Sequence, residues 1–178
     1  VNGEISSAEL SYDGNVVFAQ CDDYLLKSFD IKTGQEISSW TASTEKFWSF
    51  SLMTDQERIL SWDDNGIIKI WSVKDHQLIK SWKAHDKKMN RVNFSKDGKY
   101  FTTTSSDYTA KIWNSSDGSL YKTLIGHTQV VNAAMFINND KNILSFSEDT
   151  QLKLWNSATG ELICSFIALD EGYVSILP

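Results

Sequence analysis

The chain of 178 residues contains little cysteine, a single proline and no long apolar run. Two cysteines, Cys21 and Cys164, cannot make a disulfide framework, and free thiols suit a reducing compartment. The only proline is Pro178, at the end of the sequence. No window approaches the roughly 18 consecutive apolar residues that a membrane-spanning helix needs, so no such helix is predicted.

Basic charge is also scarce. The net charge is −6 and the pI is about 5.0, which argues against a general nucleic-acid binder with a basic face. The first residues, "VNGEISSAEL", lack the basic and apolar regions of a signal peptide, and they lack an initiator Met. We therefore expect a processed or excised piece of a cytoplasmic (intracellular) protein that binds neither nucleic acid nor membrane.

Motifs for metals, cofactors and phosphates are missing as well. The spacing of His and Cys matches no zinc pattern. The "DDNG" of residues 63–66 has no downstream Glu to complete a calcium loop, and it is typical of a tight hairpin turn. No Gly-rich phosphate loop is present. We expect no metal and no cofactor.

The chain is built from a repeat of 42 residues. One column at this spacing holds an aromatic side chain, and others hold a turn residue, a turn Asp or Asn, and an apolar residue. These columns are Phe29, Trp71, Trp113 and Trp155; Gly34, His76, Gly118 and Gly160; Asp23, Asn65, Asp107 and Asp149; and Ile5, Phe47, Met89, Val131 and Tyr173. No insertion or deletion interrupts this spacing. Because His76 stands in the column that otherwise holds a turn glycine, it is predicted to be a surface turn residue.

Within each repeat the hydrophobic pattern has a period of two. The third repeat contains "VNF", "YFTTTS", "TAKIWN" and "LYKTLI", which are separated by "SKDGK", "SSDY" and "SSDGS". Short runs of β-branched and aromatic residues between turn-forming clusters predict four antiparallel strands per repeat. The fold class is therefore all-β, in one domain over 1–178 with units at about 4–40, 46–82, 88–124 and 130–166, and a fifth that begins at 170–178.

Two segments of the later repeats carry a family resemblance. "AHDKKMNRVNFSKDGKYFTTTSSDYTAKIWN" and "GHTQVVNAAMFINNDKNILSFSEDTQLKLWN" resemble WD40 repeats, in which a Trp ends the third strand. The resemblance implies four four-stranded propeller blades plus one extra inner strand, as part of a propeller of about seven blades. The blocks "RILSWDDNGIIKIW" and "TTTSSDYTAKIW" also resemble the WD40 domains of signalling NTPase scaffolds such as apoptotic protease-activating factor.

The family resemblance implies a structural tetrad of His, Ser or Thr, Asp and Trp in each blade. Buried polar groups must be paired, and these four side chains can hydrogen-bond in sequence. His127, Ser145 and Asp149 are also the residue types of a hydrolase triad, but the set recurs one period earlier with Thr in place of Ser, which favours a structural role. The two complete sets are His85, Thr103, Asp107 and Trp113, and His127, Ser145, Asp149 and Trp155.

The set becomes incomplete toward the N-terminus, and we expect the first two blades to depend more on apolar packing and to be less rigid. The corresponding residues are Ser43, Ser61, Asn65 and Trp71 in the second repeat, and Val1, Ala19, Asp23 and Phe29 in the first.

The resemblance also implies three partner-binding positions per blade, on the face lined by loops. They are Glu4, Ser6, Asp22, Lys46, Trp48, Asp64, Lys88, Asn90, Ser106, Val130, Asn132 and Glu148. Trp48 is either an exposed anchor for a partner or a packing residue against the neighbouring blade. The turn column is acidic in three of four blades, which either attracts a basic partner or keeps the surface soluble.

We interpret the chain as a non-catalytic scaffold that binds a protein or peptide, with a basic partner expected. The alternatives are a regulatory or sensor segment of a WD40-containing signalling NTPase and, in a different class, a propeller-fold enzyme. Channel-facing positions hold no cluster of acids, bases or nucleophiles, which disfavours the enzyme. Because four blades and a strand do not make a ring of the usual size, we expect either further blades in a longer chain or a second copy to complete it.

Overall fold

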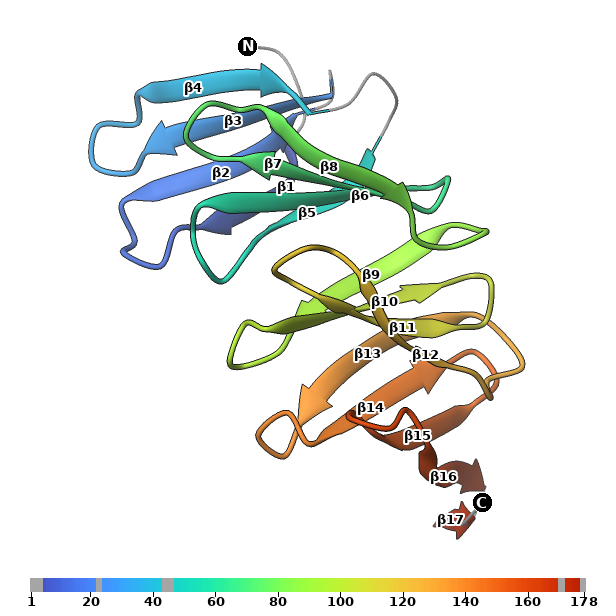
Figure 1. The fold of residues 1–178 in the computed structure, drawn as a ribbon. Coiled ribbons are helices and arrows are strands. Elements are labelled where there is room, and N and C mark those ends of the chain that lie inside the picture. Colours follow the sequence, from blue (N-terminus) through green and yellow to red (C-terminus); the bar gives the residue numbers. More distant parts are fainter. Residues whose placement is uncertain (1–4, 22–23, 43–46, 170–171, 177–178) are drawn as a thin grey trace. The chain divides into compact units, whose positions relative to one another are not determined.

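The structure of the chain, a computed structural model, is built from β-strands (Figure 1). It describes residues 5–21, 24–42, 47–169 and 172–176, and of residues 47, 48 and 168–176 it describes only the backbone. The described residues form 17 strands and no helix, so the all-β prediction is confirmed. No helix in this part of the chain is long and apolar enough to cross a membrane.

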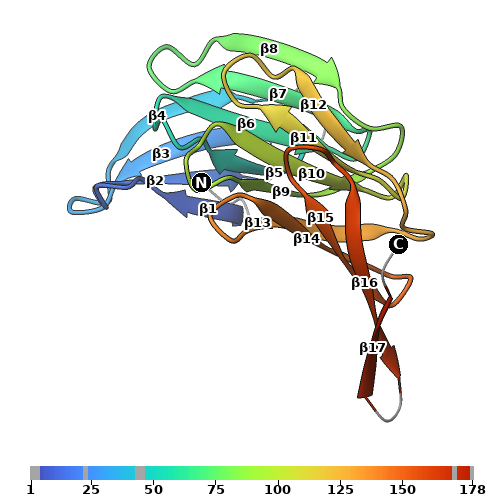
Figure 2. The ribbon, with the colours of Figure 1, turned by 60° about the horizontal axis from the view of Figure 1, so that its bottom comes forward.

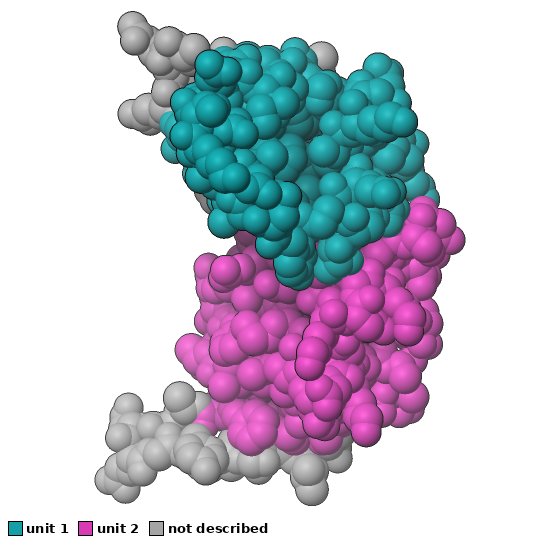
Figure 3. All heavy atoms as spheres, turned by 90° about the vertical axis from the view of Figure 1, so that its left-hand side faces the viewer, with its two compact units in different colours: residues 1–84 teal, residues 85–178 magenta. Residues whose placement is uncertain are grey.

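The strands are divided between two compact units. Unit 1 comprises residues 1–84 and unit 2 comprises residues 85–178 (Figure 3). Each unit contains two sheets that follow one another along the chain. This division is in keeping with a repeat protein, in which each structural repeat contacts only its neighbours.

Unit 1 holds two four-stranded antiparallel sheets, each with its strands in chain order. Sheet I consists of β1 (Ile5–Leu10), β2 (Val16–Cys21), β3 (Leu25–Asp30) and β4 (Glu36–Thr41). Sheet II consists of β5 (Phe47–Leu52), β6 (Arg58–Asp63), β7 (Ile67–Ser72) and β8 (Leu78–Lys83). The strand boundaries repeat at 42-residue intervals, as the sequence repeat predicts.

Unit 2 holds the other two sheets. Sheet III consists of β9 (Met89–Phe94), β10 (Tyr100–Ser105), β11 (Ala110–Asn114) and β12 (Leu120–Leu124). Sheet IV consists of β13 (Val131–Ile137), β14 (Asn142–Ser147), β15 (Gln151–Asn156), β16 (Leu162–Leu169) and β17 (Gly172–Ile176).

The position of β17 differs from the expectation that residues 170–178 begin a fifth blade. Its backbone pairs antiparallel with β16, so it extends sheet IV as a fifth strand (Figure 2). The physical reason is that the outer edge of β16 carries backbone N–H and C=O groups that need partners, and a short hairpin supplies them.

The turn between the third and fourth strands has the same geometry in every sheet. Its last residue has a positive φ, which glycine adopts without a steric penalty: Gly34 at 69°, Gly118 at 64° and Gly160 at 78°. His76 occupies this position in sheet II with a φ of 60°, so it is a turn residue as predicted. Its ring also stacks on Trp40 of β4, with centroids 4.3 Å apart.

The sheets within each unit pack through the same columns of the repeat. We call the packed side of sheets I and III the leading face, and the packed side of sheets II and IV the trailing face. In unit 1 the leading face contributes Phe18, Leu26 and Trp40, and the trailing face contributes Phe50, Ile59 and Trp71. In unit 2, Ala110, Ile112 and Leu124 of the leading face meet Val131, Ala134, Ile143 and Trp155 of the trailing face. Burial of these side chains is the main favourable contribution to packing.

Candidate partner-binding site and the hydrogen bonds that support it

Sheet IV joins its four predicted tetrad side chains in one hydrogen-bonded chain. His127 Nδ1 lies 2.8 Å from Asp149 Oδ2, and His127 Nε2 lies 2.7 Å from Ser145 Oγ. Trp155 Nε1 donates to the same hydroxyl oxygen at 2.8 Å. The four residues come from the loop before β13, from β14, from the following turn and from β15, so the chain of bonds links two strands, a turn and a loop.

Sheet III contains the same network with a threonine hydroxyl at its centre. His85 Nδ1 lies 2.9 Å from Asp107 Oδ2, and His85 Nε2 lies 2.7 Å from Thr103 Oγ1. Trp113 Nε1 donates to Thr103 Oγ1 at 2.8 Å. The hydroxyl accepts from the indole in both sheets, and in sheet III the Thr109 hydroxyl adds a bond to Asp107 Oδ1 at 2.7 Å.

Both imidazoles are held neutral. Burial lowers the pKa of His127, and the ammonium of Lys153 lowers it further, although Asp149 opposes both effects. Burial likewise lowers the pKa of His85 against the opposing effect of Asp107. With Nδ1–H donating to the carboxylate, Nε2 accepts from the hydroxyl, which leaves the hydroxyl oxygen free to accept from the indole.

The carboxylates stay ionised. Burial raises the pKa of Asp149, but hydrogen bonds from the Thr128 N–H and from His127 outweigh it and lower the pKa overall. Burial also raises the pKa of Asp107, but hydrogen bonds from His85 and Thr109 outweigh it and lower this pKa well below its usual value. Each tetrad therefore contains a neutral imidazole that is hydrogen-bonded to an ionised carboxylate.

Ser145 lacks the access that a nucleophile needs. Its side chain is buried, with a relative exposure of 0%, and its oxygen is occupied by the His127 ring and the Trp155 indole. A catalytic serine must reach the carbonyl of a substrate beside an oxyanion hole. The resemblance of His127, Ser145 and Asp149 to a triad is therefore one of bonding geometry alone.

The network is reduced in unit 1. Trp71 Nε1 donates to Ser61 Oγ at 3.0 Å, whereas Ser43 lies outside the described residues. Asn65 occupies the column of the turn carboxylate, and that role passes to Asp63, whose Oδ1 accepts from the Asn65 and Ile67 N–H groups at 2.9 Å. In sheet I the tetrad positions Val1 and Asp23 lie outside the described residues, and Ala19 and Phe29 are apolar.

The tetrad carboxylates also hold the loops that carry the predicted partner-binding residues. Asp149 Oδ2 accepts from the Thr128 N–H at 3.0 Å, and Asp107 Oδ2 accepts from the Asp86 N–H at 3.3 Å. In each sheet of unit 2, this bond ties the loop before the first strand to the turn after the second. We call this end of each sheet its loop end.

The loop ends of unit 2 gather several of the predicted positions. The Ser106 N–H donates to the Lys88 carbonyl at 2.9 Å, and the Glu148 N–H donates to the Val130 carbonyl at 2.9 Å. Asn132 follows at the start of β13 and is exposed, as is Glu148. Each sheet therefore presents its first-strand and turn positions side by side.

Asn90 makes a contact between two sheets. Its side-chain amide donates to the Val131 carbonyl at 3.0 Å, so it joins the start of β9 to the start of β13. This bond places the loop ends of sheets III and IV next to each other. The amide serves a contact between sheets, in addition to any contact that it makes with a partner.

In unit 1, fewer of the predicted partner-binding positions lie among the described residues. Ser6 and Asp64 are exposed. Glu4, Asp22 and Lys46 lie outside the described residues, and so does the side chain of Trp48, whose backbone belongs to β5. The two roles considered for Trp48 therefore stay predictions.

Sequence reasoning missed an aromatic and basic group at the loop end of sheet III. Tyr108 follows the tetrad Asp107 in the turn, is 42% exposed and has a φ of 73°. The ammonium of Lys87 lies 5.2 Å from the centroid of its ring, and Arg91 is exposed on β9. The recurrence of Tyr one residue after the turn Asp, at Tyr24 and Tyr108, is the signal that could have revealed this position.

Comparison with protein-family models identifies two repeats in the chain. Residues 76–114 and 118–156 match the family described as WD domain, G-beta repeat. The chain contains WD40 repeats. The two matched repeats cover β8 of sheet II, the four strands of sheet III and β13 to β15 of sheet IV, together with both complete tetrads. A search of curated proteins found no match to the chain.

WD40 domains are generally non-catalytic scaffolds that mediate contacts between proteins. Within the described part of the chain, no group of three or more His, Cys, Asp or Glu side chains could hold a metal ion. Cys21 and Cys164 are buried and lie outside any disulfide bond.

Proposed function

We propose that this WD40 chain is a non-catalytic recognition module that binds a protein or peptide at the loop ends of its sheets. The observation that carries the proposal is the bond from each tetrad carboxylate to the loop before the first strand, at Thr128 and Asp86. A loop held in this way loses little conformational entropy when a partner binds, so more of the contact energy appears as affinity.

The chemistry of the loop ends supports a peptide with both charged and apolar groups. Glu148 and Asp64 place negative charge in two turns, which suits the basic partner expected from the sequence. Lys87, Lys88 and Arg91 add positive charge on sheet III, and the ammonium of Lys87 lies 5.2 Å from the centroid of the exposed Tyr108 ring. An aromatic side chain flanked by cations is a typical anchor for a partner.

Selection from a displayed random-peptide library tests this proposal directly. We expect enriched peptides to bind with an affinity that Tyr108→Ala weakens by about tenfold, which corresponds to ~1.4 kcal/mol. Glu148→Lys should weaken binding of the basic peptides among them, and added salt should reduce the difference between the two proteins.

The matched control is Tyr12→Ala, because Tyr12 is 81% exposed in the turn between β1 and β2, at the opposite end of its sheet. It should leave peptide binding unchanged. Peptides whose affinity depends on Tyr12 and is indifferent to both Tyr108 and Glu148 would contradict a site at the loop ends.

A further inference from the structure

The loop ends of sheets III and IV share one backbone arrangement and differ in charge. In sheet III the Asp86 N–H donates to the tetrad carboxylate of Asp107, and in sheet IV the Thr128 N–H donates to that of Asp149. Positions 42 residues apart are therefore equivalent, and their charges can be compared one by one. Because both sheets fold in the same way, a charge that only one of them carries is not required by the fold.

The loop end of sheet III is predominantly basic. Among residues 85–91 and 105–109, the exposed charged side chains are Asp86, Lys87 and Arg91. The ammonium of Lys87 lies 5.2 Å from the centroid of the Tyr108 ring. The Asp107 carboxylate is bound to the His85 ring through one oxygen and to the Thr109 hydroxyl through the other. Exposed cations therefore outnumber exposed anions at this loop end.

The loop end of sheet IV carries negative charge and neither Lys nor Arg. Among residues 127–133 and 147–151, the exposed charged side chain is Glu148. It stands 42 residues after the uncharged Ser106. The three basic residues of sheet III are replaced in their columns by uncharged residues: Lys87 by Gln129, Lys88 by Val130 and Arg91 by Ala133.

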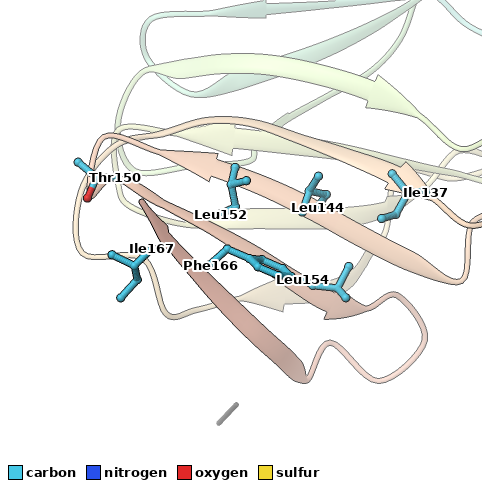
Figure 4. Close-up of a pocket in the computed structure, with 7 residues that line it drawn as sticks. All are labelled: Ile137, Leu144, Thr150, Leu152, Leu154, Phe166 and Ile167. Atoms are coloured by element: carbon cyan, nitrogen blue, oxygen red, sulfur yellow. The ribbon is translucent and has the colours of Figure 1, made fainter. Parts of the chain in front are cut away.

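The negative charge of Glu148 lies at the loop end and not in the hollow on the leading face of sheet IV. This hollow has a volume of about 580 Å³ and is lined by Thr150 and by apolar side chains of β13 to β16 (Figure 4). None of its lining side chains is charged, and Thr150 alone comes from the turn after β14. A partner that recognises charge on this sheet therefore meets it at the loop end.

The two loop ends lie side by side, with the start of β13 between them. The Thr104 hydroxyl of β10 donates to the Asn132 carbonyl of β13 at 3.4 Å. Thr104 is also the cross-strand partner of Arg91. On the other side of β13 lies β14, and the Glu148 N–H after β14 donates to the Val130 carbonyl. Arg91 and Glu148 therefore stand on opposite sides of β13.

We propose that the partner at these loop ends is a peptide segment whose charges have a fixed order. An acidic side chain of the segment, aspartate or glutamate, pairs with Arg91 and Lys87 on sheet III. A basic side chain, lysine or arginine, pairs with Glu148 on sheet IV. Between them the segment crosses the exposed amide of Asn132, and the Tyr108 ring contacts its apolar part. This inference rests on the proposed function, since it specifies the partner of the same site.

Charge order affects the choice of partner more than the strength of binding. A single ion pair between exposed side chains contributes little, because water and salt screen it. A segment with its acid and base exchanged, however, places its acid beside Glu148 and its base beside Arg91. Juxtaposed like charges disfavour the wrong partner, so the two orders should differ in affinity by about tenfold or more.

Selection from a displayed random-peptide library on two forms of the protein tests this order. Peptides enriched on the wild type should carry an acid and a base in one order along their sequence. Peptides enriched on the double variant Arg91→Glu with Glu148→Lys should carry them in the reverse order. A synthetic wild-type peptide with its acid and base exchanged should bind the wild type about tenfold more weakly, measured by fluorescence anisotropy, and should recover its affinity on the double variant.

The matched control is the double variant Lys141→Glu with Glu161→Lys. It makes the same charge changes on exposed side chains, in turns at the opposite end of sheet IV, and should enrich peptides with the wild-type order. The double variant Lys87→Glu with Glu148→Lys leaves β9 unchanged, so it keeps the test open if Arg91→Glu fails to fold. Added salt should narrow the difference in affinity between the two orders.

Three outcomes distinguish failure of this inference from failure of the proposed function. Peptides that depend on Tyr108 but carry their charges in either order, or charges of one sign, would overturn the order and leave the site at the loop ends in place. A folded Arg91→Glu, Glu148→Lys variant that enriches the wild-type order would do the same. Peptides indifferent to both Tyr108 and Glu148 would remove the site, and the charge order with it.

Discussion

The two carboxylate oxygens of Asp149 accept hydrogen bonds from different partners in sheet IV. Oδ2 accepts from the His127 ring and the Thr128 N–H, and Oδ1 accepts from the Gln151 N–H at 3.0 Å. Removing the carboxylate leaves the N–H of the buried His127 ring without its acceptor, and an unsatisfied buried donor costs more than the net value of a made bond.

Asp149→Ala is therefore expected to lower the free energy of unfolding by about 2–3 kcal/mol, measured as a shift of the urea midpoint. Its neighbour Glu148 is exposed, and Glu148→Ala should change stability by less than about 0.5 kcal/mol. Equal midpoints for the two variants would show that the carboxylate is dispensable.

The two tetrad histidines should make stability depend on pH. Burial lowers their pKa in the folded state from the usual value of 6.5, so below that value the unfolded chain binds more protons. The stability that they contribute is thus fully present above pH 6.5 and declines as the pH falls below it.

We expect the urea concentration at the unfolding midpoint of the wild type to decrease when the pH is lowered from 7.5 to 5.5. A double variant, His85→Gln with His127→Gln, should be less stable at pH 7.5 but should change less over that range. If both proteins show the same slope, the pH dependence comes from other groups.

At the scale of elements, the sheets within a unit are joined by a repeated contact between turns. The Lys96 and Asp97 N–H groups donate to the Asp140 carboxylate at 3.0 and 3.2 Å. In unit 1 the Tyr12 N–H donates to Gln56 Oε1 at 2.9 Å, between the equivalent columns. One side chain thus links the first turn of a sheet to the first turn of the next.

Asp140→Ala is expected to cost about 1–2 kcal/mol, from the lost bonds and from placing alanine at a φ of 65°. Asp140→Asn keeps an acceptor oxygen and tolerates that φ, so it should cost less. Urea unfolding of the two variants would measure the difference, and an alanine variant as stable as the asparagine variant would rule out the contact.

At the scale of the whole molecule, the two units differ in their polar networks. Unit 2 has two complete tetrads, whereas in the described part of unit 1 the network reduces to the bond from Trp71 to Ser61. Unit 1 compensates with larger apolar side chains: its trailing face has Phe50 where unit 2 has Ala134, and its leading face has Trp40 where unit 2 has Leu124.

Hydrogen exchange should therefore be slower in β10 and β14 of unit 2 than in the equivalent β2 and β6 of unit 1, because opening unit 2 breaks more buried polar contacts. Exchange rates by mass spectrometry on peptides from these strands would test this. Equal protection of the four strands would show that apolar packing fully replaces the tetrads.

Much of the fold could be predicted from the sequence. The period of 42 and the alternation within it predict four-stranded sheets, and the WD40 resemblance is confirmed by the family match. The tetrad columns could be chosen by chemistry, since a buried indole, hydroxyl, imidazole and carboxylate have few ways to satisfy one another. The partner-binding face was carried over by column and stays a prediction.

Local spacing determined what depends on residues close in sequence: the strands, the turn at His76 and the choice of tetrad residues. Tertiary structure decided what depends on which groups are left without partners. It paired β17 with the edge of β16 and gave the Asn90 amide to the Val131 carbonyl. The reason is that the partner of an edge strand or of a side-chain amide is a neighbour in space, which the spacing along the sequence does not specify.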